Sequence, residues 1–162
     1  AERLGGASIA IDADAPHDAA LASFAFRLGC TSLKVRAGQR ALYHAGANYA
    51  ASFLLCALQE AATLWEAAGI DRDAAVAAMW PLVDGTLAAA RARGLAGALA
   101  GPVSRGDGGV IDKHLSALDT LGADHAALYT ALTRRALALA AERGTPSADV
   151  LADLTQRIGR TP

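Results

Sequence analysis

The chain has 162 residues, a mean hydropathy of +0.25 and a formal net charge of −1 from 15 basic and 16 acidic residues. This length fits one ordinary domain, or one domain with a fragment of another. The balanced charge, without a basic patch or tail, argues against nucleic acid as a partner. Charges or glycines break every apolar stretch before it reaches membrane-spanning length, and no signal peptide opens the chain. We therefore expect a cytoplasmic protein that does not enter the membrane.

Cys30 and Cys56 are the only cysteines, and the four histidines form no ligand cluster. No CxxC spacing occurs, so we expect no metal site. We expect both thiols to be buried and free, as in a reducing compartment. Trp65 and Trp80 are expected to be core residues.

The first forty residues predict a strand–helix–strand unit. A short apolar run at 8–11 indicates a strand, Pro16 suits the first turn of a helix, and the alternating segment 31–35 indicates a second strand. Two short strands alone are marginally stable, so we expect them to belong to a longer sheet or to pair with another copy. The apolar face of the helix between them is predicted at Leu21, Phe24, Ala25 and Leu28.

From Gln39 to Ala68, apolar residues recur at steps of three and four residues. This pattern predicts one continuous helix of roughly 45 Å, which Gly69 should end. The helix is apolar on more than one face, so we expect it to lie at the centre of a bundle or in a dimer interface.

Helices continue through the second half of the chain. Asp71 is predicted to cap one helix, and Pro81 is predicted to begin another. A glycine-rich stretch at 94–109 follows, and Asp107 is placed to cap the next helix. The fold class is therefore mainly α, with a bundle of about six helices built on the long one.

Two further helices are predicted near the end of the chain. The first follows Gly122 and ends at Gly144, and Thr145 with Pro146 forms a start signal for the last one. The inward face of the first of these helices is predicted at Leu128, Tyr129, Leu132, Ala136 and Leu139.

His44, Asn48 and Ser52 form a polar stripe on the long helix, because residues four apart lie on one face. Burying such groups unpaired would cost about 1–3 kcal/mol each. The stripe therefore faces water, a partner or a cleft, or its members satisfy one another as an i,i+4 ladder. In a cleft, His44 would act as an acid or base, and Asn48 would orient a carbonyl or imine substrate.

The segment 100–109 contains four glycines and one proline, so it is not regular helix. Glycines followed by a helix N-terminus present free backbone N–H groups that can hold an anion. Arg105 would add a bidentate contact to a carboxylate or phosphate. The alternative is an ordinary loop between helices in which Asp107 only caps the next helix.

Several segments resemble one known family in order and spacing. That family comprises predicted oxidoreductases with an N-terminal Rossmann-like domain and a helical C-terminal domain of unknown function. Its distant relatives are pyrroline-5-carboxylate reductase, 6-phosphogluconate dehydrogenase and the related β-hydroxyacid dehydrogenases. The most specific parts are Tyr-His-Ala at 43–45 and Gly-Pro-x-x-Arg-Gly-Asp at 101–107. The matching segments are ALYHAGANYAASFLLCAL (41–58), WPLVDGTL (80–87), LAGPVSRGD (99–107), HLSAL (114–118) and LYTALTRRALALA (128–140).

The resemblance implies that residues 1–40 are the end of a Rossmann-like nucleotide-binding domain and that residues 41–162 are a helical dimerisation and substrate-side domain. The full-length protein would use NADP or NAD, held by a glycine-rich turn upstream of Ala1, and this chain alone would bind neither. The family often has a Ser-Asn or Asn-His-like pair at the positions of Ala51 and Ser52. It also often has an Asn a few residues after Thr86, where this chain has alanines.

The resemblance also implies a homodimer, a small anionic substrate of unknown identity, and a site in two parts. The catalytic candidates are His44 and Asn48. The substrate-binding candidates are Ser52, Thr86, Gly101, Pro102, Arg105, Gly106 and Asp107. The alternative function is a non-catalytic helical module for dimerisation or scaffolding.

Overall fold

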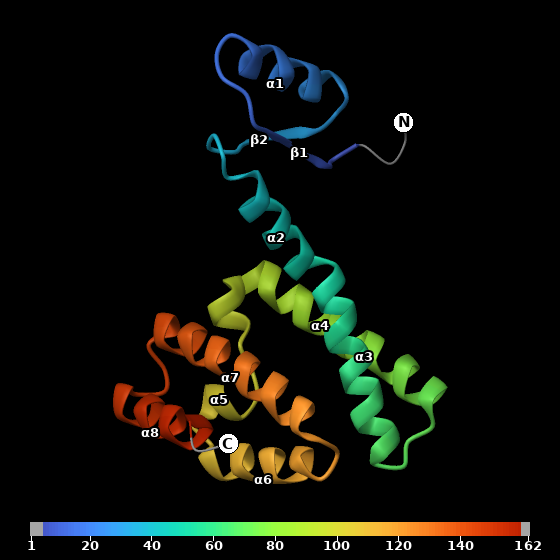
Figure 1. Cartoon of the computed structure of the whole chain (residues 1–162), viewed down its shortest axis with the longest axis vertical. Coiled ribbons are helices and arrows are strands. Elements are labelled where there is room, and N and C mark those ends of the chain that lie inside the picture. Colours follow the sequence, from blue (N-terminus) through green and yellow to red (C-terminus); the bar gives the residue numbers. More distant parts are fainter. Residues whose placement is uncertain (1–4, 160–162) are drawn as a thin grey trace. The chain divides into compact units, whose positions relative to one another are not determined.

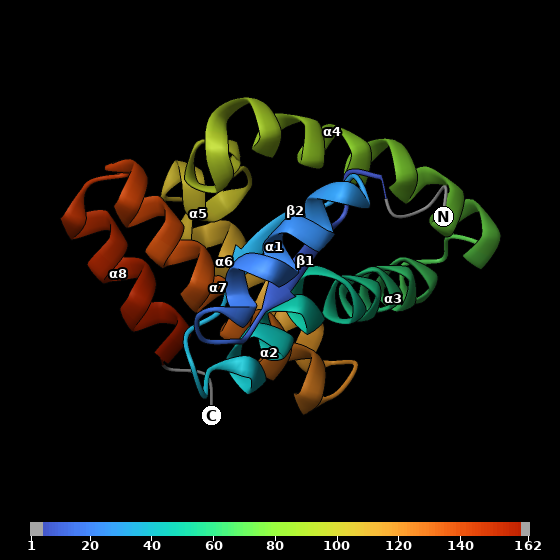
Figure 2. The same cartoon turned by 90° about the horizontal axis from the view of Figure 1, so that it is seen from above.

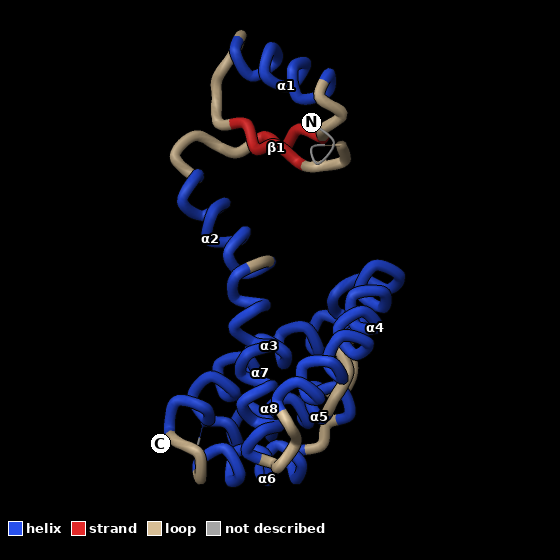
Figure 3. The backbone as a smooth tube through the Cα atoms, turned by 90° about the vertical axis from the view of Figure 1, so that its right-hand side faces the viewer, coloured by secondary structure: helices blue, strands red, loops and turns tan. Residues whose placement is uncertain are grey.

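The structure is a computed structural model that describes residues 5–159 (Figure 1). The chain forms two compact units, Ala1–Ala61 and Ala62–Pro162, which we call the N-terminal and the C-terminal unit. Among the described residues, strands occur only in the N-terminal unit, and helices form most of both units (Figure 3). The predicted mainly α class is confirmed. No helix within residues 5–159 combines the length and apolar character needed to cross a bilayer.

The N-terminal unit begins with the predicted strand–helix–strand arrangement. It consists of β1 (Ser8–Ile11), α1 (His17–Arg27) and β2 (Thr31–Lys34). The strands pair in parallel, from Ser8 opposite Thr31 to Ile11 opposite Lys34. Helix α1 lies along one face of this small sheet (Figure 1). Gly29, at φ +73°, makes the turn from α1 into β2 that a residue with a Cβ would resist.

The expected long helix is two helices, α2 (Arg40–Ala50) and α3 (Ser52–Ala67). The helix breaks at Ala51, whose φ and ψ of −124° and −79° are not helical. The prediction of one continuous helix is therefore wrong at this residue. The apolar period continues on both sides of the break, so side-chain spacing alone does not reveal it. The predicted end at Gly69 is confirmed, because Gly69 has φ +89° and its N–H donates to the carbonyl of Glu66.

The C-terminal unit is a helical bundle arranged around α7. Helix α7 contacts α4, α5, α6 and α8, and it lies beside α8 in a helical hairpin (Figure 2). Its core is formed by Val103, Ile111, Leu115, Leu118, Ala126, Leu137, Ala140, Leu154 and Ile158. The helices are α4 (Arg72–Ala98), α5 (Pro102–Arg105), α6 (Gly108–Asp119), α7 (Ala123–Arg143) and α8 (Ala148–Gly159).

Two predicted helix starts are confirmed by their caps. The Asp71 carboxylate accepts from the N–H groups of Asp73 and Ala74 at the start of α4, and the Asp107 carboxylate accepts from Val110 at the start of α6.

Three other boundary predictions are wrong. Pro81 lies inside α4 and does not begin a helix. Proline has no N–H to donate to the Ala77 carbonyl one turn earlier. Because Pro81 and Ala77 are both exposed, that carbonyl can accept a hydrogen bond from solvent instead. The helix continues past Gly94, where φ of +74° marks a kink, and so enters the stretch predicted as glycine-rich loop. At the other end, α8 starts at Ala148, two residues after Pro146.

The buried face of α7 agrees with the predicted one only in part: Tyr129 and Ala136 pack against the core, whereas two predicted leucines do not. Leu128 and Leu132 are 41% and 52% exposed. The buried residues are Ala126, Thr130, Thr133, Leu137 and Ala140, and all of them except Leu137 are smaller than leucine. Small side chains let four neighbouring helices approach α7 closely. The close packing of these helices determines which face of α7 is buried, and hydrophobicity alone does not predict that face correctly.

Some residues expected in the core are exposed. Trp80 and Cys56 are exposed, whereas Cys30 is buried as predicted. On α1 only Ala25 is buried, and Phe24 of the predicted face is 52% exposed.

We predict that Gly106→Ala destabilises the C-terminal unit by about 1–3 kcal/mol. Gly106 has φ +71°, and a Cβ there would lie 2.6 Å from Cγ1 of Val150 in α8. Gly109→Ala is the matched control, because its Cβ would meet nothing closer than the Asp107 carboxylate oxygen at 3.7 Å. Urea unfolding of both variants measures the difference; equal stabilities would contradict the assigned packing of the loop on α8.

Candidate functional site

The polar stripe lies on the surface of the N-terminal unit. His44 and Asn48 lie on α2, whereas Ser52 is the first residue of α3, beyond the break at Ala51. All three are exposed. No hydrogen bond joins any two of them in the described part of the chain, so they do not form a self-satisfying ladder. His44 and Asn48 are therefore open to a ligand or partner.

The His44 ring is held by its neighbour Tyr43. The two rings meet edge to face, with centroids 5.5 Å apart and an interplanar angle of 67°. Such an arrangement contributes about 0.5–1.5 kcal/mol beyond burial for aromatic pairs. Tyr43 is half-buried, whereas every other residue of α2 is exposed. Tyr43 also lines a hollow at the start of α2.

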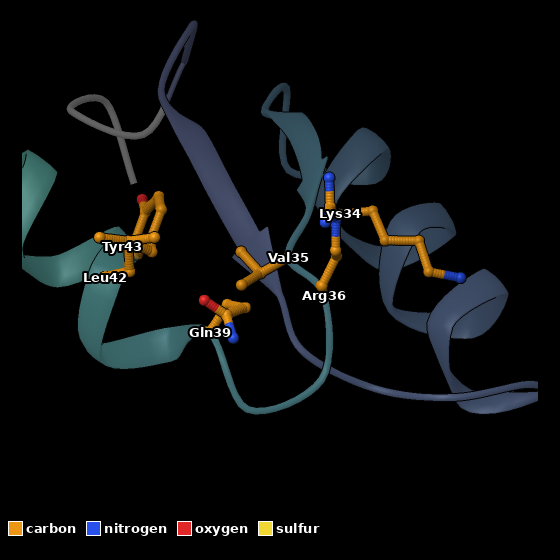
Figure 4. Close-up of a pocket in the computed structure, with 6 residues that line it drawn as sticks. All are labelled: Lys34, Val35, Arg36, Gln39, Leu42 and Tyr43. Atoms are coloured by element: carbon orange, nitrogen blue, oxygen red, sulfur yellow. The ribbon is translucent and has the colours of Figure 1, made fainter.

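That hollow is a cavity of about 410 Å³ where β2 leads into α2 (Figure 4). Figure 4 shows Val35 between the strand and the side chains of Leu42 and Tyr43. The carboxyl ends of parallel strands, followed by a helix, are the usual place for ligands in α/β sheets. The six lining residues are Lys34, Val35, Arg36, Gln39, Leu42 and Tyr43.

The two cations beside the cavity differ in their partners. The Lys34 ammonium forms an ion pair of 2.7 Å with the Asp18 carboxylate of α1. This hydrogen bond lowers the pKa of the Asp18 carboxyl and raises the pKa of the Lys34 ammonium. The Arg36 guanidinium makes no ion pair or hydrogen bond with the described residues. Arg36 is thus the cation left for an incoming group.

The cavity was not predicted from the sequence, although the charge distribution along the chain contains one signal for it. Between Ala19 and Gln59 the chain has no Asp or Glu, in a protein whose charges otherwise balance. The basic residues of that stretch are Arg27, Lys34, Arg36 and Arg40.

The second predicted group, residues 101–107, lies in the C-terminal unit and is built around the short helix α5. Gly101 has φ +87° and precedes Pro102, the first helical residue. Gly106 ends α5 in the left-handed conformation, and Asp107 caps α6. The Ser104 hydroxyl donates to the Gly101 carbonyl at 3.0 Å. Each of these roles is structural, as the ordinary-loop alternative predicts.

The backbone of this loop offers fewer free donors than expected. The N–H groups of Gly106, Asp107 and Gly108 donate to carbonyls of residues 102–106, and that of Val110 donates to the Asp107 carboxylate. The expectation that the glycines present free N–H groups is therefore not met at these positions. The Arg157 side chain also fills the space beside Gly108, where a Cβ would lie 2.6 Å from its Nε.

Arg105 is the residue of the loop without a structural role in the described part of the protein. Its side chain is exposed and makes no hydrogen bond or ion pair with residues 5–159. Thr86 differs, because its hydroxyl donates to the Leu82 carbonyl of its own helix at 2.9 Å.

Arg143, which sequence analysis also missed, fixes the loop from behind. Its guanidinium donates to the carbonyl of Leu99 at 3.1 Å and to that of Ser104 at 3.0 Å. It also donates to the hydroxyl and the carbonyl of Thr145. The loop between α4 and α5 is thereby tied to the end of α7.

His114 points to α7 and not to the loop. Its Nδ1 lies 2.8 Å from the Tyr129 hydroxyl. Burial raises the pKa of the Tyr129 phenol, while a hydrogen bond from Thr133 acts in the opposite direction. This pair is separate from the residues predicted to bind substrate.

The described residues do not fit the phosphates of a nucleotide cofactor. The turn that follows β1 runs from Asp12 to Pro16 and has two carboxylates and no glycine. Such a turn repels a pyrophosphate, which requires close approach of backbone N–H groups. Among residues 5–159 no group of three His, Cys, Asp or Glu side chains could hold a metal ion.

A family model matches residues 7–136, which is most of the chain, and its description is domain of unknown function (DUF2520). The chain belongs to this family. A comparison with curated proteins and another with solved structures each found no match. The DUF2520 match covers the predicted catalytic pair, the cavity and the loop 101–107, and its description assigns no chemistry to them.

Proposed function

We propose that this DUF2520 chain is the C-terminal, substrate-side and dimerisation part of an NAD(P)-dependent oxidoreductase whose nucleotide-binding part lies upstream of Ala1. The observation that carries the proposal is the position of α2. It follows a parallel β–α–β unit directly, and its Tyr43, whose ring contacts that of His44, lines the cavity at the carboxyl end of β2. The family resemblance of segments 41–58 and 99–107 supports it independently.

In this proposal His44 holds or accepts the proton at the reacting atom. The imidazole of histidine is well suited to proton transfer near neutral pH. Asn48, one turn further along α2, offers both a donor and an acceptor to orient a carbonyl or imine group. Val35, Leu42 and Tyr43 supply an apolar wall of the cavity on which a substrate can pack.

By resemblance, Arg105 of the C-terminal unit is proposed as a contact for an anionic group, separately from the cavity of the N-terminal unit. Its guanidinium is exposed, and its main chain is fixed by α5 and by Arg143. Gly101, Pro102, Gly106 and Asp107 then serve to hold Arg105 in place. Ser52 and Thr86 remain candidates by resemblance.

A homodimer is the second part of the proposal. From Ala41 to Gln59 the chain has no charged residue apart from the titratable His44, and yet no residue of α2 is buried. Exposed apolar patches of this kind are rare on monomers. A second copy would cover the same face on both chains, as two-fold symmetry requires. The large exposed apolar residues of α2 and α3 that do not line the cavity are Tyr49, Phe53, Leu54 and Leu55.

The competing function is a non-catalytic helical module for dimerisation or scaffolding. It explains the exposed apolar helices as well as the enzyme does. It gives no role to the Arg36 guanidinium, the His44–Tyr43 contact or the cavity between them. A cofactor-binding measurement separates the two functions.

We expect the protein encoded by the complete reading frame to gain thermal stability with saturating NADP(H) or NAD(H), because a ligand that binds only the folded state stabilises it. Differential scanning fluorimetry measures the shift. This 162-residue chain is the control and should show none. If none of the four nucleotides changes the melting temperature of the longer protein, the oxidoreductase proposal is contradicted and the non-catalytic scaffold function is favoured.

We expect this chain to have the mass of a dimer in sedimentation equilibrium at micromolar concentration. Tyr49→Lys should shift it to the monomer, because Tyr49 is 71% exposed within the uncharged stretch. Phe26→Lys is the matched control, since Phe26 is 81% exposed on α1, outside the proposed interface. A monomeric mass for the unmodified chain would refute the dimer.

A further inference from the structure

We propose that the cavity between β2 and α2 binds a small organic anion whose charged group pairs with Arg36 and whose apolar part packs on Val35, Leu42 and Tyr43. The use of this cavity as a substrate site rests on the proposed function. The binding itself does not, because it follows from the cavity and the charges of this chain.

The size and shape of the cavity suit a small molecule. Its volume of about 410 Å³ falls in the range of ligand pockets, which is roughly 300–1,000 Å³. All six lining residues belong to one continuous segment, 34–43, in the N-terminal unit.

The charge distribution selects an anion. Lys34 is paired with Asp18, and Figure 4 shows its side chain directed away from Leu42 and Tyr43. Arg36 has no such partner among the described residues. No acidic residue occurs between Ala19 and Gln59, and Asp12 and Asp14, the carboxylates at the same end of the sheet, form no ion pair with Arg36 in the described part of the chain. A guanidinium binds carboxylate and phosphate groups bidentately, which gives the site its preference.

The apolar residues that line the cavity favour a ligand that has an apolar part in addition to its charged group. Val35 and Leu42 are aliphatic, and the Tyr43 ring can pack against a flat or unsaturated group. The Gln39 side chain makes no capping hydrogen bond at the start of α2, so its amide remains available to the polar end of the ligand. A short organic acid or phosphate ester meets all of these requirements.

The test is a titration of the 15N-labelled chain with benzoate, phenyl phosphate and the neutral analogue benzyl alcohol. We expect the amide signals of residues 34–44 to shift with the anions, and the tighter anion identifies the charged group that the site prefers. Arg36→Gln should weaken binding about tenfold, as expected for the loss of one charge-assisted pair. Arg27→Gln is the matched control, because it removes one exposed charge from α1.

A second variant keeps the test decisive if Arg36→Gln does not fold. Leu42 is 70% exposed, so Leu42→Glu should fold, and its carboxylate in the cavity wall should abolish anion binding. Phe26→Glu adds the same charge outside the cavity and should leave binding unchanged. Equal affinity for benzyl alcohol, equal weakening by Arg27→Gln, or shifts outside 34–44 would overturn the proposal. None of these results depends on a nucleotide cofactor, so failure here is distinct from failure of the oxidoreductase function.

Discussion

One guanidinium, that of Arg143, joins three helix ends in the C-terminal unit. It donates to carbonyls at the end of α4 and within α5, and to Thr145 just beyond the end of its own helix α7. Carbonyls at helix C-termini carry partial negative charge, so a cation is favourable at each of them. A planar group with five donors can satisfy all three ends at once, which the single ammonium of a lysine cannot do in the same geometry. The loop that displays Arg105 is rigid because Arg143 holds both sides of it.

The glycines of this loop show how a functional pattern can have a structural cause. Gly106 permits the approach of Val150, and Gly108 leaves room for Arg157, which also pairs with Asp112 and Asp153. These contacts come from α8, far along the chain, and the sequence around 101–109 contains no sign of them. The glycines of this loop are therefore explained by packing. The interpretation as an anion-binding loop now depends on Arg105, an exposed side chain to which the described contacts give no structural role.

Local signals predicted the elements that local chemistry determines. The strands and the caps at Asp71 and Asp107 were all predicted, since each depends on a few adjacent residues. The break at Ala51 was not predicted, because neither glycine nor proline marks it. The buried face of α7 was predicted only in part, because four neighbouring helices select it. The same limit applies to the site: helical spacing identified His44 and Asn48, whereas the cavity beside them forms only when the end of β2 meets α2.

The central proposal is that His44 of α2 holds or accepts the proton at the reacting atom when a nicotinamide cofactor is bound to the full-length protein. The His44 imidazole is the direct reporter, because it is exposed and adjoins Tyr43 at the cavity. With only four histidines in the chain, its ring signals can be assigned by a single His44→Gln variant. We expect these signals to shift when NADP(H) or NAD(H) saturates the protein of the complete reading frame, and to stay unchanged in this chain alone. A cofactor that binds while the His44 signals do not move would contradict the claim.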